Sequence, residues 1–219
     1  MNSVIDEISK RSREEILSKV SNGYKIPCHV KTETQNPVIH IKVKENLIEN
    51  LVENMTANKF VVHDIDKSKL IDTINEIAKN HNANTLLYPS DLGIDVSKVN
   101  ATERRVFDKQ IEEMRYDVFH TDFSIINVFK GVASHGVACV VSSEHQPRML
   151  SLSMPLCIML LKKEDVVKSL VDALDAVKSK NEILPTNILF IAGPSRTSDI
   201  ELITVFGVHG SQSVHLILY

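Results

Sequence analysis

The stretch Asn187-Ile-Leu-Phe-Ile-Ala-Gly-Pro-Ser-Arg-Thr-Ser-Asp-Ile-Glu201 decides the fold of this chain, because it joins an apolar strand to a polar loop. The apolar residues 188–192 indicate a buried strand, and the loop that follows is rich in hydroxyl groups. The pattern then predicts a helix that opens at about Ser198, a glycine turn at Gly207-Val-His-Gly210, and a last strand over 214–218. Strands that alternate with helices in this way are typical of α/β proteins.

The same alternation extends through most of the chain. Helices are predicted over 46–58, 68–80, 102–114 and 164–179, with Ser68 as the cap of the second. Strands are predicted over 59–65, 85–88, 119–128, 136–141 and 156–161. Because these strands are short and almost wholly apolar, they fit a sheet that is covered on both faces. The predicted fold class is therefore α/β, a three-layer, Rossmann-like arrangement around a mostly parallel sheet.

The N-terminal region has a different pattern from the rest. Residues 3–21 show helical spacing of apolar side chains, and Asn22-Gly23 ends that helix. Residues 24–40 contain Pro27 and Pro37 among polar residues and are expected to be extended. We therefore expect an N-terminal helix and extended arm over 1–40, and an α/β domain over 41–219.

Composition narrows the classes of function. The 219 residues carry a net charge of −3, so no basic excess favours nucleic-acid binding. No apolar run reaches the roughly 18 residues of a transmembrane helix, and the N-terminus lacks the apolar core of a signal peptide. These observations predict a soluble, cytoplasmic protein.

Cysteine and histidine spacing gives no metal motif. Cys28, Cys139 and Cys157 are far apart, and no CxxC pair is present. The nine histidines form no HxH, HxxxH or HExxH pattern. We therefore expect no metal site, and no cofactor held by this chain alone.

The loop at 193–199 is the first candidate site. Its donors would join the free N–H groups at the start of the predicted helix, where anions bind well. Arg196 can hold a carboxylate or a phosphate through two parallel hydrogen bonds. The alternative is that this loop only caps the helix. The candidate anion-binding residues are Ser195, Arg196, Thr197, Ser198 and Asp199.

Two glycine turns are further candidates. In the turn between Gly207 and Gly210, His209 could carry a proton, so it is the candidate catalytic residue, although it could equally bond the backbone of a tight turn. In the other turn, Gly131 and Gly136 bracket Ser134 and His135. Adjacent Ser and His side chains do not make a nucleophilic pair by proximity alone, so the alternative is a glycine-permitted hairpin or bulge.

Gly193-Pro-Ser-Arg-Thr-Ser-Asp-Ile-Glu201 followed by Gly207-Val-His-Gly210 resembles the C-terminal motif of the lactate utilization protein C family, which has a LUD domain. Ser12-Arg-Glu-Glu-Ile-Leu17 and Leu150-Ser-Leu-Ser-Met-Pro155 are similar to two further motifs of that family. One segment departs from the family pattern. Where the family has Ile-Ala-Glu-(Thr/Ser)-Gly-Thr, this chain has Val132-Ala-Ser-His-Gly-Val137, with Ser134 in place of the acid.

The resemblance implies a fold similar to the NagB/RpiA/CoA-transferase group. It also implies a role as a non-cluster subunit of a complex that oxidises L-lactate to pyruvate. Iron–sulfur clusters would then reside in partner subunits, and the pocket of this chain would bind a small carboxylate. The sequence does not decide whether this chain is itself an enzyme or whether it forms homo-oligomers.

Two other functions remain open at this stage. The chain could be a stand-alone enzyme that acts on a phosphorylated sugar, a folate or an acyl-CoA, by analogy of fold. It could also be a scaffold for iron–sulfur partners, with residues 1–40 as the docking element.

Overall fold

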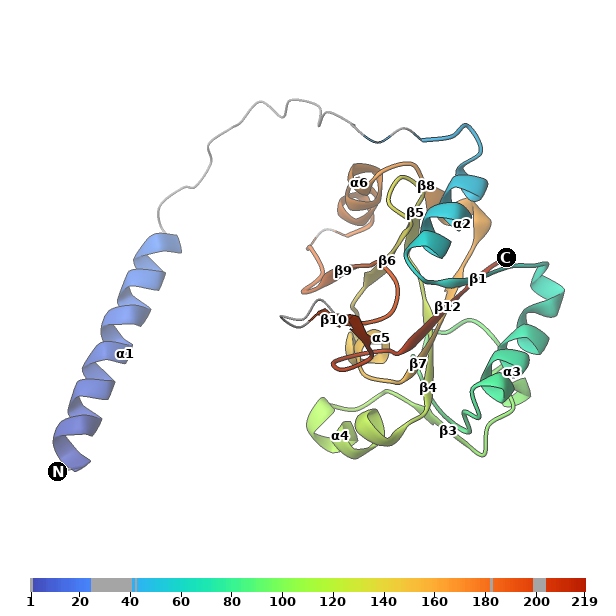
Figure 1. Ribbon diagram of the computed structural model, residues 1–219. Helices are drawn as coiled ribbons and strands as arrows, with labels where there is room; N and C mark the ends of the chain where they lie inside the picture. The colour runs from blue at the N-terminus through green and yellow to red at the C-terminus, as the bar shows by residue number, and fades with distance from the viewer. Residues whose placement is uncertain (1, 25–40, 42, 182, 199–203) are drawn as a thin grey trace. The chain divides into compact units, whose positions relative to one another are not determined.

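The computed structural model describes residues 2–24, 41, 43–181, 183–198 and 204–219 (Figure 1). The chain divides into two compact units, Met1–His40 and Ile41–Tyr219. In the first unit, helix α1 (Asn2–Tyr24) covers the helix predicted over 3–21 and exposes Ile8, Ile16 and Val20. Among the described helices, none is both long and apolar enough to cross a membrane.

A six-stranded parallel sheet forms the centre of the second unit. Its strand order is β1-β12-β7-β4-β2-β3, and every pairing within it is parallel. The strands are β1 (Val61–Asp64), β2 (Thr85–Tyr88), β3 (Glu103–Val106), β4 (Phe123–Asn127), β7 (Leu156–Leu161) and β12 (Ser213–Leu218). This sheet and its covering helices confirm the predicted α/β fold class with a mostly parallel sheet.

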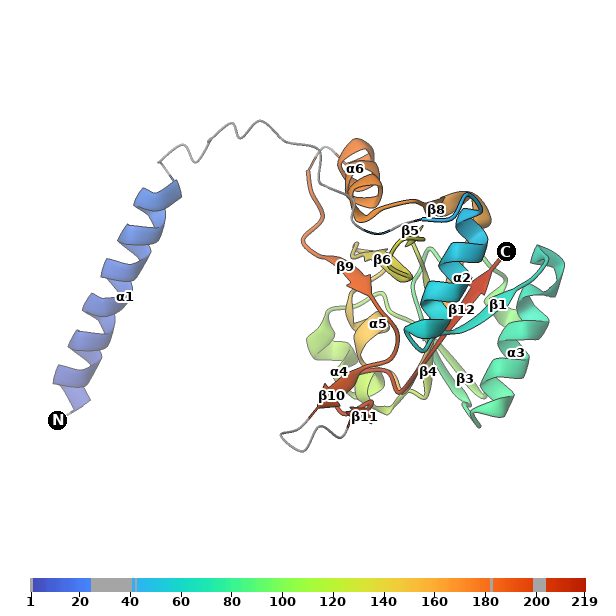
Figure 2. The ribbon, with the colours of Figure 1, turned by 45° about the horizontal axis from the view of Figure 1, so that its top comes forward.

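Alternate side chains of the strands enter two separate cores, one on each face of the sheet. On one face, Ile125, Ile158 and Ile217 pack with helix α3 (Leu70–Asn80). On the other face, Cys157, Met159 and Leu216 pack with helices α2 (Leu47–Ala57), α4 (Ile111–His120) and α5 (Met149–Leu152). Figure 2 shows α3 on one side of the sheet and α4 and α5 on the other. Successive strand side chains point to opposite faces, which explains why residues one apart in β7 enter different cores.

The second unit also contains a second sheet, which has four strands. Its order is β8-β5-β6-β9, with strands β5 (Lys130–Val132), β6 (Val137–Val141), β8 (Val166–Val167) and β9 (Ile188–Ile191). Helix α6 (Leu170–Lys180) packs on it through Ala173 and Val177. β5 and β6 form an antiparallel hairpin, so the hairpin interpretation of the turn at 131–136 is confirmed.

The helix predicted over 102–114 is wrong. Residues Glu103–Val106 form the edge strand β3, and the helix α4 begins only at Ile111. Charged residues suit this strand because it pairs with β2 on one side alone and exposes its other edge. Arg105 forms ion pairs with Glu103 and Asp117, which holds the strand to α4.

Two helix starts also differ from the prediction. The short 3₁₀ turn η1 (Lys67–Lys69) precedes α3, and Ser68 does not cap that helix. The helix predicted over 164–179 begins at Leu170, because Ser169 and Asp172 form a capping box there. The two valines of β8 before it pair with β5 instead.

Three histidines meet at the edge of the parallel sheet. His215 of β12 lies between His63 of β1 and His81, with ring nitrogens 3.0 Å apart on both sides. Burial is the main cause that lowers the pKa of His215 to about 4, and the neighbouring imidazoles of His63 and His81 contribute to the same shift. Burial also lowers the pKa of His63. His215 is therefore neutral in the folded protein at neutral pH.

These lowered pKa values predict that stability falls as the pH falls from about 6.5 to about 4. In that window the unfolded chain binds a proton at His215 that the folded chain does not bind, so acid favours unfolding. We expect the free energy of unfolding, measured with urea, to be about 2 kcal/mol lower at pH 5.0 than at pH 7.5. His215→Leu should remove most of that difference, whereas the exposed His120→Gln should keep it. Equal pH dependence in both variants would contradict this assignment.

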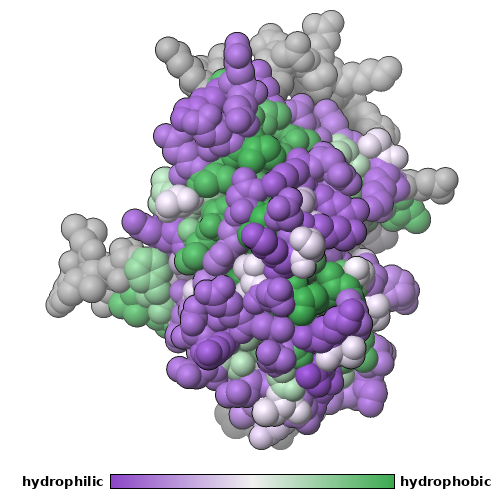
Figure 3. All heavy atoms as spheres, turned by 90° about the vertical axis from the view of Figure 1, so that its right-hand side faces the viewer, coloured by the Kyte–Doolittle hydropathy of each residue, from purple (hydrophilic) through white to green (hydrophobic). Residues whose placement is uncertain are grey.

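Helices α2 and α3 lie beneath the face drawn in Figure 3, which is mostly hydrophilic with small separate hydrophobic areas. Several large exposed apolar side chains lie in α4, in strand β11 (Thr204–Phe206), which pairs with β10 (Arg196–Ser198), and in the turn after β11. They are Tyr116, Phe119, Val205, Phe206 and Val208.

Candidate functional site

Two asparagines of α2, and a third that caps its C-terminus, hold the turn that joins β5 to β6. Asn50 and Asn54 each donate a hydrogen bond of 2.8 Å to the carbonyl oxygen of Ala133. Asn58 donates to the carbonyl oxygens of His135 and Gly136, at 2.8 and 2.9 Å. Residues four apart lie on one face of a helix, so this spacing forms a row of amide donors along the turn.

Close packing against α2 explains the glycine at the end of this turn. Gly136 has a φ of +60°, and a Cβ at this position would lie 2.3 Å from the backbone carbon of Asn54. Ser134 is buried, and its hydroxyl lies 2.6 Å from Nδ1 of His135. The hydroxyl and the imidazole therefore satisfy each other beside the end of α2.

The end of α2 also contacts the Gly193 loop. Gly193 has a φ of +90°, and a Cβ there would lie 2.0 Å from the carbonyl oxygen of Asn58. Arg196 donates from Nη2 to the carbonyl oxygens of Ala192, at 2.6 Å, and Asn58, at 3.4 Å. Asn58 therefore joins the turn at Gly136 to the loop at Gly193, which lie 57 residues apart in the sequence.

The helix predicted to open at Ser198 is wrong. β10 (Arg196–Ser198) pairs with β11 (Thr204–Phe206) in an antiparallel hairpin, with Thr197 opposite Val205. Two physical arguments for the anion site fall with that helix. First, Ser198 lies in a strand, so no helical N–H groups are available there. Second, the strand before the loop, β9, pairs antiparallel with β6 in the second sheet. The loop is therefore not at the carboxyl edge of the parallel sheet. Asp199 lies outside the described residues.

A small pocket nevertheless brings Ser195 and His209 together. It has a volume of about 220 Å³ and is lined by Gly193, Ser195, His209, Gly210 and Ser211, with Leu152, Ile191 and Val214 as its apolar wall. Hydrogen bonds hold its backbone, since Ser195 N–H donates to Ser211 O and Gly207 N–H donates to Ser195 O, both at 2.9 Å. Gly207 has a φ of +76°, which permits this turn after β11 rather than after a helix. We call this the Ser195–His209 pocket.

Among the described residues that line this pocket, Ser211 is the one with a buried hydroxyl group that lacks a hydrogen-bond partner. Its side chain is 5% exposed, and its hydroxyl has no hydrogen-bond partner among the described residues. Leaving a buried hydroxyl unpaired costs about 1–3 kcal/mol, so a polar molecule bound in the pocket would recover that loss. The sequence analysis missed Ser211 because nothing distinguishes one serine in a polar turn. It also missed the asparagines of α2, although their four-residue spacing was readable.

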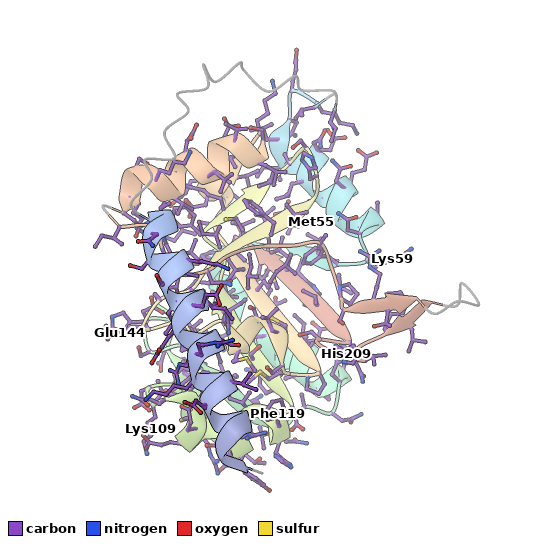
Figure 4. All side chains as sticks on the ribbon, turned by 90° about the vertical axis from the view of Figure 1, so that its left-hand side faces the viewer. Met55, Lys59, Lys109, Phe119, Glu144 and His209 are labelled. Carbon is purple, nitrogen blue, oxygen red and sulfur yellow. The ribbon has the colours of Figure 1, made fainter. Side chains whose placement is uncertain are left out.

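The exposed side of His209 faces a larger hollow. This second hollow, of about 470 Å³, is lined by His209, Gly210 and the apolar side chains of Phe119, Met149, Leu152 and Val208. Figure 4 shows His209 at the base of the β10–β11 hairpin. His209 therefore lies between a polar pocket and an apolar surface. Arg196 is exposed and lies beside Gly193, so its charge is close to the polar side.

The described residues contain neither a reactive thiolate nor a group of side chains that could hold a metal ion. Burial raises the pKa of Cys139 to about 11 and of Cys157 to about 12, so neither is a thiolate at neutral pH. Among the described side chains, no three from His, Cys, Asp and Glu are placed to hold a metal ion. Cys28 lies outside the described residues.

An α/β domain with a polar pocket beside a glycine-rich loop is a ligand-binding scaffold of a common kind. The family model of the LUD domain matches residues 48–219, so the chain belongs to the LUD domain family. A crystal structure of a DUF162 family protein from Deinococcus radiodurans has a similar fold. Its TM-score is 0.59 at 14% identity, over 78% of this chain and 95% of the other.

Several curated proteins are similar in sequence. NMB1437 of Neisseria meningitidis is 25% identical over 72% of this chain and 70% of its own length. YkgG of Escherichia coli K12 is 32% identical over 50% of this chain and 46% of its own. A protein of Bacillus licheniformis named lactate utilization protein C is 32% identical over 36% of this chain and 34% of its own.

Proposed function

We propose that this chain takes part in lactate utilization and that it binds a small carboxylate in the Ser195–His209 pocket. Membership of the LUD domain family, with several relatives named lactate utilization protein C, is the observation that carries the role. In this proposal the chain is a non-cluster component that works beside iron–sulfur subunits.

The contents of the pocket suit a small hydroxy acid. The hydroxyls of Ser195 and Ser211 donate hydrogen bonds to a carboxylate, and the guanidinium of Arg196 beside Gly193 supplies the positive charge. The apolar wall of Leu152, Ile191 and Val214 accepts a methyl group. The pocket volume of about 220 Å³ lies below the range of about 300–1,000 Å³ that is typical for drug-sized ligands, so it suits a smaller molecule.

His209 supplies the only chemical step that we assign to this chain. Oxidation of a hydroxy acid requires removal of the hydroxyl proton together with a hydride equivalent. The imidazole of His209, which lines the pocket, can accept that proton. The two electrons pass to a redox centre, which in this proposal belongs to a partner subunit.

Ser211→Ala tests the pocket. Because the Ser211 hydroxyl has no partner, its removal should leave the free energy of unfolding unchanged or slightly higher. The affinity for L-lactate, measured by isothermal titration of the full chain, should fall about tenfold, as expected for one lost hydrogen bond to a charged group.

Ser142→Ala is the matched control, since the Ser142 hydroxyl is also buried, has no partner in the described part of the chain, and lines none of the pockets described here. It should leave lactate binding unchanged. Equal affinity of the wild type and Ser211→Ala would contradict the placement of the carboxylate.

A further inference from the structure

A separate pocket lies at the opposite end of the parallel sheet, beyond the carboxyl ends of β2, β4 and β7. It has a volume of about 420 Å³, and the side chains used below are Asp91, Asn127, Phe129, His145, Asp165 and Lys180. Ligands of open α/β sheets bind beyond the carboxyl ends of the strands, and this volume falls in the usual range for organic ligands. We call it the carboxyl-end pocket.

Hydrogen bonds fix one wall of this pocket. The side chain of Gln146 accepts from the N–H of Asn127 at 2.8 Å and donates to its carbonyl oxygen at 3.0 Å, which ends β4. The Asn127 amide donates to Asp91 O at 3.1 Å. Ser90 N–H donates to His145 O at 3.2 Å, and the Ser90 hydroxyl lies 3.1 Å from His145 Nδ1. These bonds join three segments into a wall that exists before any ligand binds.

The charges of the pocket are only partly compensated. Lys130 forms an ion pair of 2.6 Å with Asp165, so that pair carries no net charge. The ammonium group of Lys180 lies 5.2 Å from the centre of the Phe129 ring. Among the described residues, no ion pair includes Lys180 or Asp91. One positive and one negative group therefore line the same pocket without a partner.

We propose that the carboxyl-end pocket binds an organic anion that also carries several hydroxyl groups. The acidic group of the ligand pairs with Lys180, and its hydroxyls donate to the carboxylate of Asp91 and to the free amide oxygen of Asn127. The carbon skeleton lies against Phe129 and Val141. L-Lactate has a single hydroxyl group and would fill little of this volume, so the ligand differs from the small carboxylate of the Ser195–His209 pocket.

Isothermal titration of the full chain with gluconate and with glycerol 3-phosphate tests this assignment. The first probe has a carboxylate and the second a phosphate, so the two arms separate the possible acidic groups. We expect saturable binding of at least one of them. Glucose lacks the charge and acetate lacks the hydroxyls, so both should bind at least tenfold more weakly.

Lys180→Met removes the charge and keeps the apolar stem, and it should weaken binding of the successful probe at least tenfold. Lys178→Met is the matched control, because Lys178 lies in the same helix and pairs with Asp175 outside the pocket. Ser211→Ala should not change this binding. Absence of saturable binding by the wild type, equal affinity of the two lysine variants, or weakening by Ser211→Ala would each overturn the proposal.

Discussion

Gly136→Ala should lower the free energy of unfolding by about 3–5 kcal/mol. Two costs add at this position. An alanine with a φ of +60° is strained by about 1–2 kcal/mol, and its Cβ would lie 2.3 Å from the backbone of Asn54. Backbone of α2 cannot move as a side chain can, so the hairpin turn must leave its asparagine donors. Urea unfolding of the purified protein measures the loss.

Gly93→Ala is the control that separates these two costs. Gly93 also has a positive φ, of +73°, but a Cβ there would approach no atom closer than 4.0 Å. The control should therefore lose only about 1–2 kcal/mol, the cost of the backbone conformation. Equal losses in the two variants would show that the contact between the turn and α2 contributes nothing.

Arg196→Gln should abolish growth on L-lactate when it replaces the wild-type chain. In the proposed site the guanidinium supplies the positive charge that holds a carboxylate, and glutamine supplies none. Arg196 is exposed and bonds two carbonyl oxygens, so we expect less than about 1 kcal/mol of lost stability. The measurement is the growth rate with L-lactate as the sole carbon source, compared with glucose.

Arg115→Gln is the control for this variant, because Arg115 is an exposed arginine of α4, whereas Arg196 lies beside Gly193, which lines the pocket. Its growth on L-lactate should equal that of the wild type. Normal growth of Arg196→Gln, with the variant protein present at the wild-type level, would remove the carboxylate role from Arg196.

Most of the fold could be predicted because the local patterns were strong. The strands β2 and β7 are apolar and end at proline or at charged residues, so their spacing identified them. The edge strand β3 could not be recognised, because its charged residues suit a helix surface equally well until the pairing with β2 is known. β5 and β8 have only three and two residues, too few to show any period.

The candidate site was predicted less well, for a different physical reason. Ser195 and His209 were named from their turns, and the structure places them in one pocket. Where the helix was expected, the described residues Arg196–Ser198 and Thr204–Phe206 are paired strands, and local sequence does not reveal the pairing of Thr197 with Val205. The asparagines of α2 act on a turn about 80 residues away, so only the folded chain shows their role.

The most direct measurement is the rate of L-lactate oxidation by cell extract from a strain that lacks this chain. Our account predicts that the extract oxidises lactate slowly and that the purified chain restores the rate, whereas the Arg196→Gln protein does not. A rate that is normal without the chain, or that the purified wild-type chain fails to restore, would contradict a role in lactate utilization.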